Sequence, residues 1–168
     1  MDGPRTLVVM RHAKAEPYAD DDRERRLTAR GRADAVAAGQ QLAAWGVRPD
    51  HALVSAAART IETWELVKQA LDGSPVEEYD EELYAGSAAT VLETLHGVSD
   101  EHRTVVLVGH NPVASYLATV LHDGTGDPAA IRGLLAGFPP AALAVLEHDG
   151  GWDSLGEGTA RLARFHAP

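Results

Sequence analysis

The sequence predicts an α/β fold, a three-layer αβα sandwich with a mostly parallel central sheet and helices on both faces. Short apolar runs, such as residues 6–10 and 104–108, alternate along the chain with longer segments that have helical spacing. This alternation is typical of parallel strands that are joined by crossover helices. The last two apolar runs, residues 143–148 and 160–165, are separated by turn-forming residues, so we expect an antiparallel C-terminal edge.

The first half of the chain supplies three of the expected strands and two of the helices. Thr28 can cap the first helix, which Gly46 ends, and Pro75 lies in the turn after the second helix. The charged residues 20–26 precede the first helix; they could recognise a protein partner or be solvated, and we favour solvation. The expected strands are residues 6–10, 51–54 and 76–79, and the expected helices are residues 29–45 and 57–71.

The second half of the chain predicts two more helices and three more strands. Ser87 can cap a helix that runs through His96, and the Asn111-Pro112 turn leads into another helix at about residues 113–121. Residues 122–127 are rich in glycine and aspartate, so we expect a loop there. The expected strands are residues 104–108, 143–148 and 160–165.

Composition limits the class of protein. The chain has 168 residues, of which 45% are hydrophobic, so we expect one domain over residues 1–168 with an adequate core. A net charge of −10 argues against nucleic-acid binding, because a nucleic-acid-binding surface would be basic. The absence of cysteine excludes disulfides, thiolate catalysis and cysteine-ligated metals. No leader-like segment and no apolar run of ~20 residues is visible, so we expect a cytoplasmic protein without a membrane partner.

Chemically useful residues follow three of the expected strands, where open α/β sheets usually bind their ligands. Arg11-His12 follows the first strand, Gly109-His110 follows the strand at residues 104–108, and Arg59 lies four residues after Ser55. Any one of these could be structural, since single strand-end histidines often bond only to the backbone and helix arginines are usually solvated. Because the strand ends share one edge of the sheet, we expect the side chains to converge on a catalytic phosphoryl pocket.

Four segments together resemble the signature of the histidine phosphatase superfamily. Arg11-His12-Ala13 resembles its RHG motif, and Leu27-Thr28-x-x-Gly31-Arg32 resembles its LTxxGR segment. Ser55-x-x-x-Arg59-x-x-x-Thr63 resembles the SPxxRAxxT helix start, and Gly109-His110-Asn111-Pro112 resembles the second histidine motif. The resemblance covers nearly the whole chain and fits the short bacterial branch related to phosphohistidine phosphatases, which lacks the large insertions of phosphoglycerate mutases and phytases.

The resemblance implies a role for each matching residue. His12 would be the nucleophile, and Arg11, Arg59 and His110 would bind the phosphoryl oxygens, with Asn111 beside them. For attack, one ring nitrogen of the nucleophile must be unprotonated, and a backbone carbonyl on the other nitrogen would fix that tautomer. No metal or other cofactor is needed, because the cationic side chains take over the metal's electrostatic role.

The general acid is less clearly marked than the nucleophile. Larger relatives use a carboxylate after the second helix, and the candidates here are Asp80, Glu81 and Glu82, of which we choose Glu82. The alternative is that this acidic run is a solvated turn. A weak acid site would favour leaving groups that need little protonation, such as imidazole. Lys14 is a further cation near the pocket mouth, although we favour a solvated side chain.

The sequence therefore predicts a metal-independent phosphatase that works through a phosphohistidine at His12. Its partner would be a phosphorylated protein, carrying phosphohistidine, or a small phosphorylated metabolite. A phosphoryl mutase on the same scaffold and a non-catalytic module that binds phosphorylated ligands remain as alternatives. A histidine–metal hydrolase is less favoured, because the other histidines show no metal-like spacing: His51, His96, His102, His122, His148 and His166.

Overall fold

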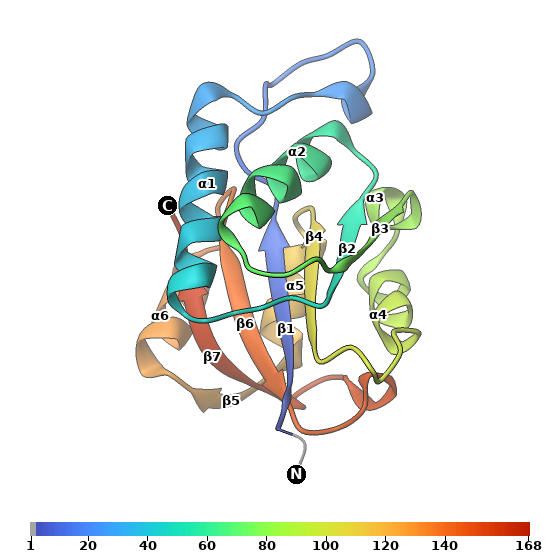
Figure 1. The fold of residues 1–168 in the computed structure, drawn as a ribbon, viewed down its shortest axis with the longest axis vertical. Helices are drawn as coiled ribbons and strands as arrows, with labels where there is room; N and C mark the ends of the chain where they lie inside the picture. The colour runs from blue at the N-terminus through green and yellow to red at the C-terminus, as the bar shows by residue number, and fades with distance from the viewer. Residues whose placement is uncertain (1–2) are drawn as a thin grey trace.

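Seven strands form one sheet in the computed structural model, which describes residues 3–168 (Figure 1). The strand order is β3-β2-β4-β1-β6-β7-β5. Four of the neighbouring pairs are parallel and two, β1–β6 and β6–β7, are antiparallel. The mostly parallel α/β sandwich that the sequence predicts is therefore confirmed. The strands are β1 (Arg5–Arg11), β2 (His51–Ser55), β3 (Val76–Asp80), β4 (Thr104–Gly109), β5 (His122–Gly126), β6 (Leu143–His148) and β7 (Ala160–His166).

The register of the central strands brings the two sequence motifs together. Strand β1 pairs in parallel with β4, with Met10 opposite Val108 and Arg11 opposite Gly109. The residues that follow, His12 and His110, therefore leave the sheet side by side at its carboxyl edge. On its other side β1 pairs in antiparallel fashion with β6.

Alternation along the buried strands builds one core on each face of the sheet. In β1, Leu7 and Val9 pack into the core on the side of α4, α5 and α6, while Val8 and Met10 pack against α1 and α2. Strands β4 and β6 repeat this two-sided pattern. A strand with both faces buried reads as a continuous apolar run, which is the signal present in the sequence.

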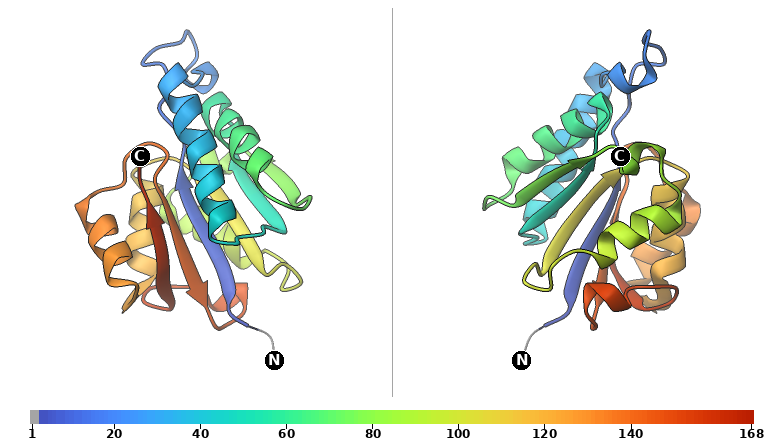
Figure 2. Two further views of the ribbon diagram at one scale, coloured as in Figure 1. Left: turned by 60° about the vertical axis from the view of Figure 1, so that its left-hand side comes forward. Right: turned by 90° about the vertical axis from the view of Figure 1, so that its right-hand side faces the viewer.

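Helices cover both faces of the sheet, and Figure 2 shows the two layers. Thr28 caps α1 by accepting a hydrogen bond from the Gly31 amide, and Ser87 caps α4 in the same way, as the sequence predicts. The α-helices are α1 (Ala29–Ala44), α2 (Ala58–Val67), α3 (Glu82–Ala85), α4 (Ala88–His96), α5 (Val113–Leu121) and α6 (Pro128–Ala136). Short 3-10 helices lie at η1 (Asp22–Glu24), η2 (Lys68–Ala70) and η3 (Trp152–Ser154).

Three sequence predictions about elements need correction. Residues 122–126 form strand β5, where we expected a loop, and β5 pairs in parallel with β7. The antiparallel β1–β6–β7 side of the sheet is present as the sequence predicts, and β5 adds one strand beyond β7. Helices α3 and α6 were not predicted, and the expected helix at residues 57–71 divides into α2 and η2. No helix within residues 3–168 is long and apolar enough to cross a membrane.

Candidate active site

The backbone of His12 is tied to two neighbouring segments. Its amide donates to the Gly109 carbonyl at 3.0 Å, and its carbonyl accepts from the Ala141 amide at 3.0 Å. Ala141 has φ of 65°, and it is the one residue other than glycine with positive φ among residues 3–168. An alanine with positive φ costs about 1 kcal/mol relative to the ordinary backbone conformations. The turn before β6 is therefore strained at Ala141, whose amide holds the His12 carbonyl.

The His12 ring is fixed in one tautomer. Its Nδ1 lies 2.8 Å from the Ala13 carbonyl oxygen, which can only accept, so Nδ1 carries the proton and Nε2 keeps its lone pair. This is the backbone carbonyl that the sequence argument expects. The side chain is buried, and burial together with the charges of Arg59 and Arg11 lowers the pKa of His12 to about 4. At neutral pH the ring therefore offers an unprotonated Nε2.

The second histidine is held by a serine at the end of β2. His110 Nε2 lies 2.7 Å from Oγ of Ser55, which is fully buried, and the ring centroids of His110 and His12 are 5.3 Å apart. Burial, with the neighbouring His12 and Arg59, lowers the pKa of His110 to about 3, so this ring is neutral as well. When Ser55 donates to Nε2, the His110 proton sits on Nδ1, from which it can be donated to an oxyanion.

Two arginines lie at this edge of the sheet, and neither has all of its donors engaged within residues 3–168. Arg11 Nη1 donates to the Phe138 carbonyl at 3.2 Å, and Arg59 Nη1 donates to the Asp22 carbonyl at 2.8 Å. The Nε atoms of both guanidiniums are buried and have no hydrogen-bond partner among the described residues. Both side chains line the same hollow, so an oxyanion bound there would meet two guanidiniums. Arg59 also lies in the first turn of α2, where the helix dipole favours an anion.

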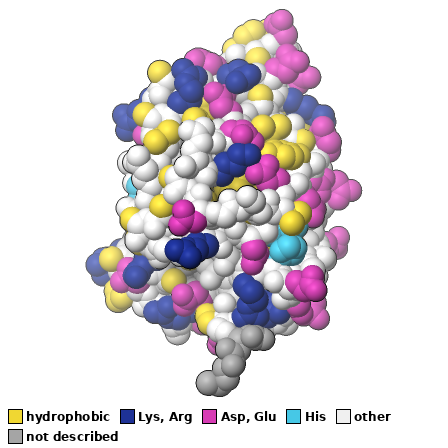
Figure 3. Space-filling view, in the orientation of Figure 1, with side chains coloured by type: hydrophobic (Ala, Val, Ile, Leu, Met, Phe, Trp, Pro, Cys, Tyr) yellow, Lys and Arg dark blue, Asp and Glu magenta, His cyan; other side chains and the backbone are white. Residues whose placement is uncertain are grey.

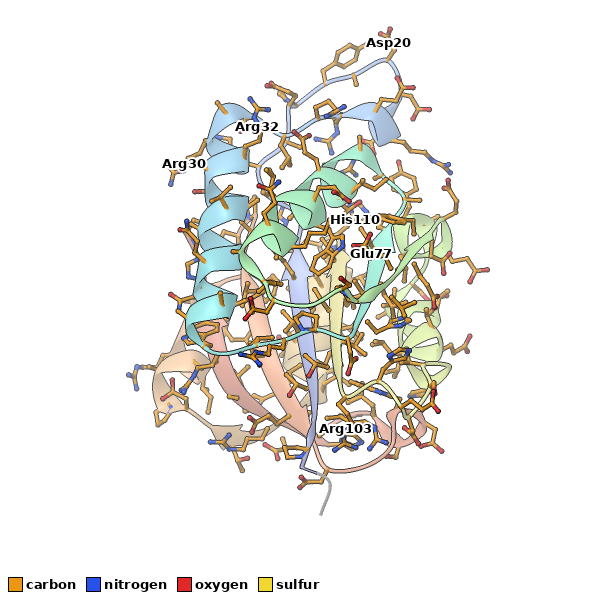
Figure 4. All side chains as sticks on the ribbon, viewed as in Figure 1. Asp20, Arg30, Arg32, Glu77, Arg103 and His110 are labelled. Atoms are coloured by element: carbon orange, nitrogen blue, oxygen red, sulfur yellow. The ribbon has the colours of Figure 1, made fainter. Side chains whose placement is uncertain are left out.

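These groups line an open hollow of about 280 Å³. Figure 4 shows His110 at the carboxyl edge of the sheet. A larger hollow of about 370 Å³ near the other end of α1 is lined by no histidine. The residue types in the lining, and not the volume, therefore distinguish the site. Five of the six sequence-predicted residues are brought together. The lining residues of the site are Arg11, His12, Lys14, Ala15, Arg25, Arg59, His110, Asn111 and Pro140.

Asn111 lies in this lining, and its amide is engaged with the backbone. Its Nδ2 donates to the Phe138 carbonyl at 2.9 Å, which is also the acceptor of Arg11 Nη1. Its Oδ1 accepts from the Ser115 amide at 3.2 Å in the first turn of α5. The side chain therefore joins α5 to the loop that holds Arg11, with one N–H of Nδ2 left over.

Glu82 is not brought to the site. It lies exposed at the start of α3, where its amide is bonded to Oδ1 of Asp80 at 2.8 Å, and it does not line the hollow. The α3 turn buries Leu83 instead, which directs the neighbouring acidic residues to solvent. This part of the chain behaves as the solvated acidic turn that was the alternative to a general acid.

The carboxylate that reaches the site is Asp22, which the sequence argument left in a solvated segment. Its Oδ2 accepts from the Tyr84 hydroxyl at 2.7 Å and from Arg59 Nη2 at 3.1 Å, and its Oδ1 accepts from Arg25 Nε at 2.9 Å. The Tyr84 hydrogen bond and the two arginines lower the pKa of Asp22 to about 2. Asp22 is therefore an anion that positions two arginines, and residues 20–26 are exposed but not merely solvated.

Comparison with known proteins identifies the family. Residues 7–87 match the histidine phosphatase superfamily (branch 1). The chain is 31% identical over 153 residues to a phosphohistidine phosphatase SixA homolog from Haemophilus influenzae, with 86% of this chain and 88% of the relative covered. The chain belongs to the histidine phosphatase superfamily.

Other relatives extend this histidine phosphatase match over nearly the full chain. An uncharacterized protein from Mycobacterium tuberculosis is 37% identical over 161 residues, which cover 95% of this chain and 99% of the relative. A solved structure from Nakamurella multipartitia, named for the phosphohistidine phosphatase SixA, superposes with a TM-score of 0.87 at 33% identity and covers 99% and 98% of the two chains. A structure of the protein histidine phosphatase SixA complexed with tungstate gives a TM-score of 0.79 at 25% identity, with 97% of each chain covered.

Members of the superfamily are phosphatases or mutases, and the SixA-like neighbours support a phosphatase. Within residues 3–168 the structure contains no group of three or more His, Cys, Asp or Glu side chains that could hold a metal ion.

Proposed function

We propose that this protein is a metal-independent phosphatase that forms a covalent phosphohistidine at His12 and acts on phosphohistidine in a protein. The observation that carries the proposal is the buried, neutral His12, whose Nε2 has a free lone pair in a hollow that Arg11 and Arg59 also line. A nucleophile and preorganised cationic donors are the two requirements of phosphoryl transfer without a metal.

In the first step His12 Nε2 attacks the phosphorus atom, and the N–P bond forms as the bond to the leaving group breaks. The electron pair of that bond goes to the leaving group, which takes a proton from solvent. Arg11, Arg59 and His110 donate to the equatorial oxygens, where charge accumulates. In the second step water attacks the phosphorus atom, the N–P bond breaks, and inorganic phosphate leaves while His12 becomes neutral again.

The absence of a carboxylic acid from the lining favours one kind of leaving group. Glu82 lies outside the hollow, and Asp22 is ionised, so neither is placed to protonate a departing alkoxide. A phosphohistidine ring that is protonated on its other nitrogen, which has a pKa of about 6.5 in free imidazole, leaves as neutral imidazole, so it needs no acid at the breaking N–P bond. A protein phosphohistidine is therefore the substrate that this site fits best, and a small phosphomonoester with a good leaving group comes second.

A phosphoenzyme trap tests the proposal. The protein is incubated in EDTA with radiolabelled phosphoramidate and quenched in base at millisecond intervals. We expect alkali-stable, acid-labile label on the wild type, normal labelling of His102→Ala and no label on His12→Ala. Phosphate binding without label or hydrolysis would instead indicate a binding module, and label that returns to an isomerised product would indicate a mutase. Turnover that survives in His12→Ala would refute the covalent mechanism.

A further inference from the structure

The phosphoryl pocket continues into a second hollow along the N-terminal end of α1. This hollow also measures about 280 Å³ and is open to solvent. It shares Lys14 and Pro140 with the phosphoryl pocket, so the two hollows adjoin, and we call them together the groove. The lining residues of the second hollow are Lys14, Arg30, Asp34, Pro139, Pro140 and Pro168.

Lys14 stands where the two hollows meet, and its backbone is held firmly. Its carbonyl accepts from the Thr28 amide at 2.9 Å and from Thr28 Oγ1 at 3.2 Å. The first turn of α1 packs so closely that a Cβ at Gly31 would clash with the same carbonyl. The backbone of Lys14 is thus fixed by the cap of α1, while the residue is exposed and lines both hollows.

The charges around Lys14 are unbalanced. Arg25 and Arg59 in the pocket are both paired with Asp22, and Arg30 in the second hollow is held by both carboxylate oxygens of Asp34 at 2.9 and 3.1 Å. Lys14 has no ion pair among residues 3–168.

Helix α1 borders the groove, and the positive end of its dipole lies there. The first turn of α1 contains no acidic residue. Figure 4 places Arg30 and Arg32 at this end of the helix, and Figure 3 shows Lys and Arg side chains there with Asp and Glu side chains among them, in a chain whose net charge is −10. A group with a negative charge would therefore be attracted to the groove beside the phosphoryl pocket.

We propose that Lys14 and the groove along α1 form a subsite for an acidic side chain of a phosphorylated polypeptide, close in sequence to the phosphorylated residue. The proposal rests on the proposed function and names the substrate class more narrowly. An extended polypeptide advances about 3.3 Å per residue, so a carboxylate two residues from the phosphohistidine lies about 7 Å along the groove. An open groove with rigid proline walls can accept a chain that continues beyond the reacting group, which a small metabolite does not need.

A pair of phosphohistidine peptides tests the subsite. One carries Glu at two residues on each side of the phosphohistidine, and the other carries Gln at both positions. We expect the wild type to prefer the Glu peptide by about two- to fivefold in kcat/KM, the range of an exposed ion pair. In Lys14→Gln the ratio should fall to about one, and in Lys14→Glu the Gln peptide should become the better substrate. The preference of the wild type should shrink at high salt.

A matched lysine variant separates a local effect from a change in net charge. Lys68 is paired with Glu65 and Glu77, outside the groove, so Lys68→Gln should keep the wild-type preference. Equal rates of the two peptides with the wild type, or an unchanged ratio in Lys14→Glu, would overturn the subsite. Label at His12 from phosphoramidate, with no turnover of either peptide, would also overturn it and leave the phosphoenzyme chemistry standing. Failure of the labelling itself would overturn the proposed function.

Discussion

The chain contains two pairs of neighbouring histidines at opposite ends of the same sheet. His12 and His110 follow the carboxyl ends of β1 and β4, with ring centroids 5.3 Å apart. His51 and His102 lie at the amino ends of β2 and β4, with ring centroids 4.5 Å apart. Both pairs contain a buried histidine, so proximity and burial alone do not distinguish a reactive pair from a structural one.

The charges that face each pair do distinguish them. Arg11 and Arg59 line the same hollow as the first pair, and the charge of Arg59 lowers the pKa of both histidines. In the second pair, His51 Nε2 lies 3.3 Å from Glu78 and His102 Nδ1 lies 3.6 Å from Asp50. Carboxylates repel a phosphoryl group and guanidiniums bind it, so only the pair at the carboxyl end can serve phosphoryl transfer.

The largest difference in activity is expected between two single variants, each of which removes one histidine from one pair. His110→Ala deletes a donor to the developing charge and should lower kcat by about 10²–10³. His102→Ala should leave kcat/KM within twofold of the wild type, because its ring faces Asp50 at the other end of the sheet. Steady-state kinetics with phosphoramidate measure both. A comparable loss in the two variants would mean that the arginines do not set the two pairs apart.

A smaller effect is expected from the hydrogen bond that positions His110. Ser55→Ala leaves Nε2 of the half-buried His110 ring unpaired and frees the other tautomer, so kcat should fall by about fivefold with little change in KM. The matched control is Ser154→Ala, since Ser154 Oγ bonds His148 Nε2 at 2.9 Å near the opposite end of the sheet. Equal effects of the two variants on kcat would argue for a loss of folding stability rather than for a positioning role.

The strand ends were predictable because local signals specify them. Burial of both faces of β1 and β4 favours β-branched and apolar residues in succession, and parallel pairing then places His12 beside His110. Helix α6 could also have been predicted from the sequence, because Asp127 caps it and Pro128 occupies its first turn, which is a recognisable start signal. The neighbouring Gly124 and Gly126 obscured that signal by favouring a loop at β5.

The Asp22 contacts were not predictable in the same way. Asp22 lies 37 residues from Arg59 and 62 from Tyr84, and nothing in its own segment distinguishes it from Asp20 or Asp21. Its partners are decided by where the segment before α1 lies over α2, which is a matter of tertiary packing. The position of Glu82 was not predictable either, because the acidic residues before Leu83 are alike in sequence. Only the direction of α3 separates them from the site.

The smallest expected effect concerns how each pair responds to pH. The pKa of His12 is about 4, so its Nε2 stays unprotonated as pH falls through 6.5, and the acid limb of kcat/KM should lie near pH 4. The protonation of the phosphoramidate substrate is measured separately, so that its titration can be distinguished from the titration of His12. An acid limb at pH 6–7 that follows the enzyme rather than the substrate would contradict a buried, neutral His12.

His51 should appear in stability rather than in activity. Burial lowers the pKa of His51 below its ordinary value of 6.5, so the unfolded chain binds a proton before the folded protein does. Its contribution to the free energy of unfolding is complete above pH 6.5 and is lost as pH falls below that value. His51→Asn should therefore reduce the pH dependence of the unfolding free energy below pH 6.5, by at most about 1.4 kcal/mol per pH unit. His12 and His110 titrate in the same direction, so some pH dependence should remain. Urea unfolding at several pH values measures the slope, and an unchanged slope in His51→Asn would show that Glu78 offsets the burial of this ring.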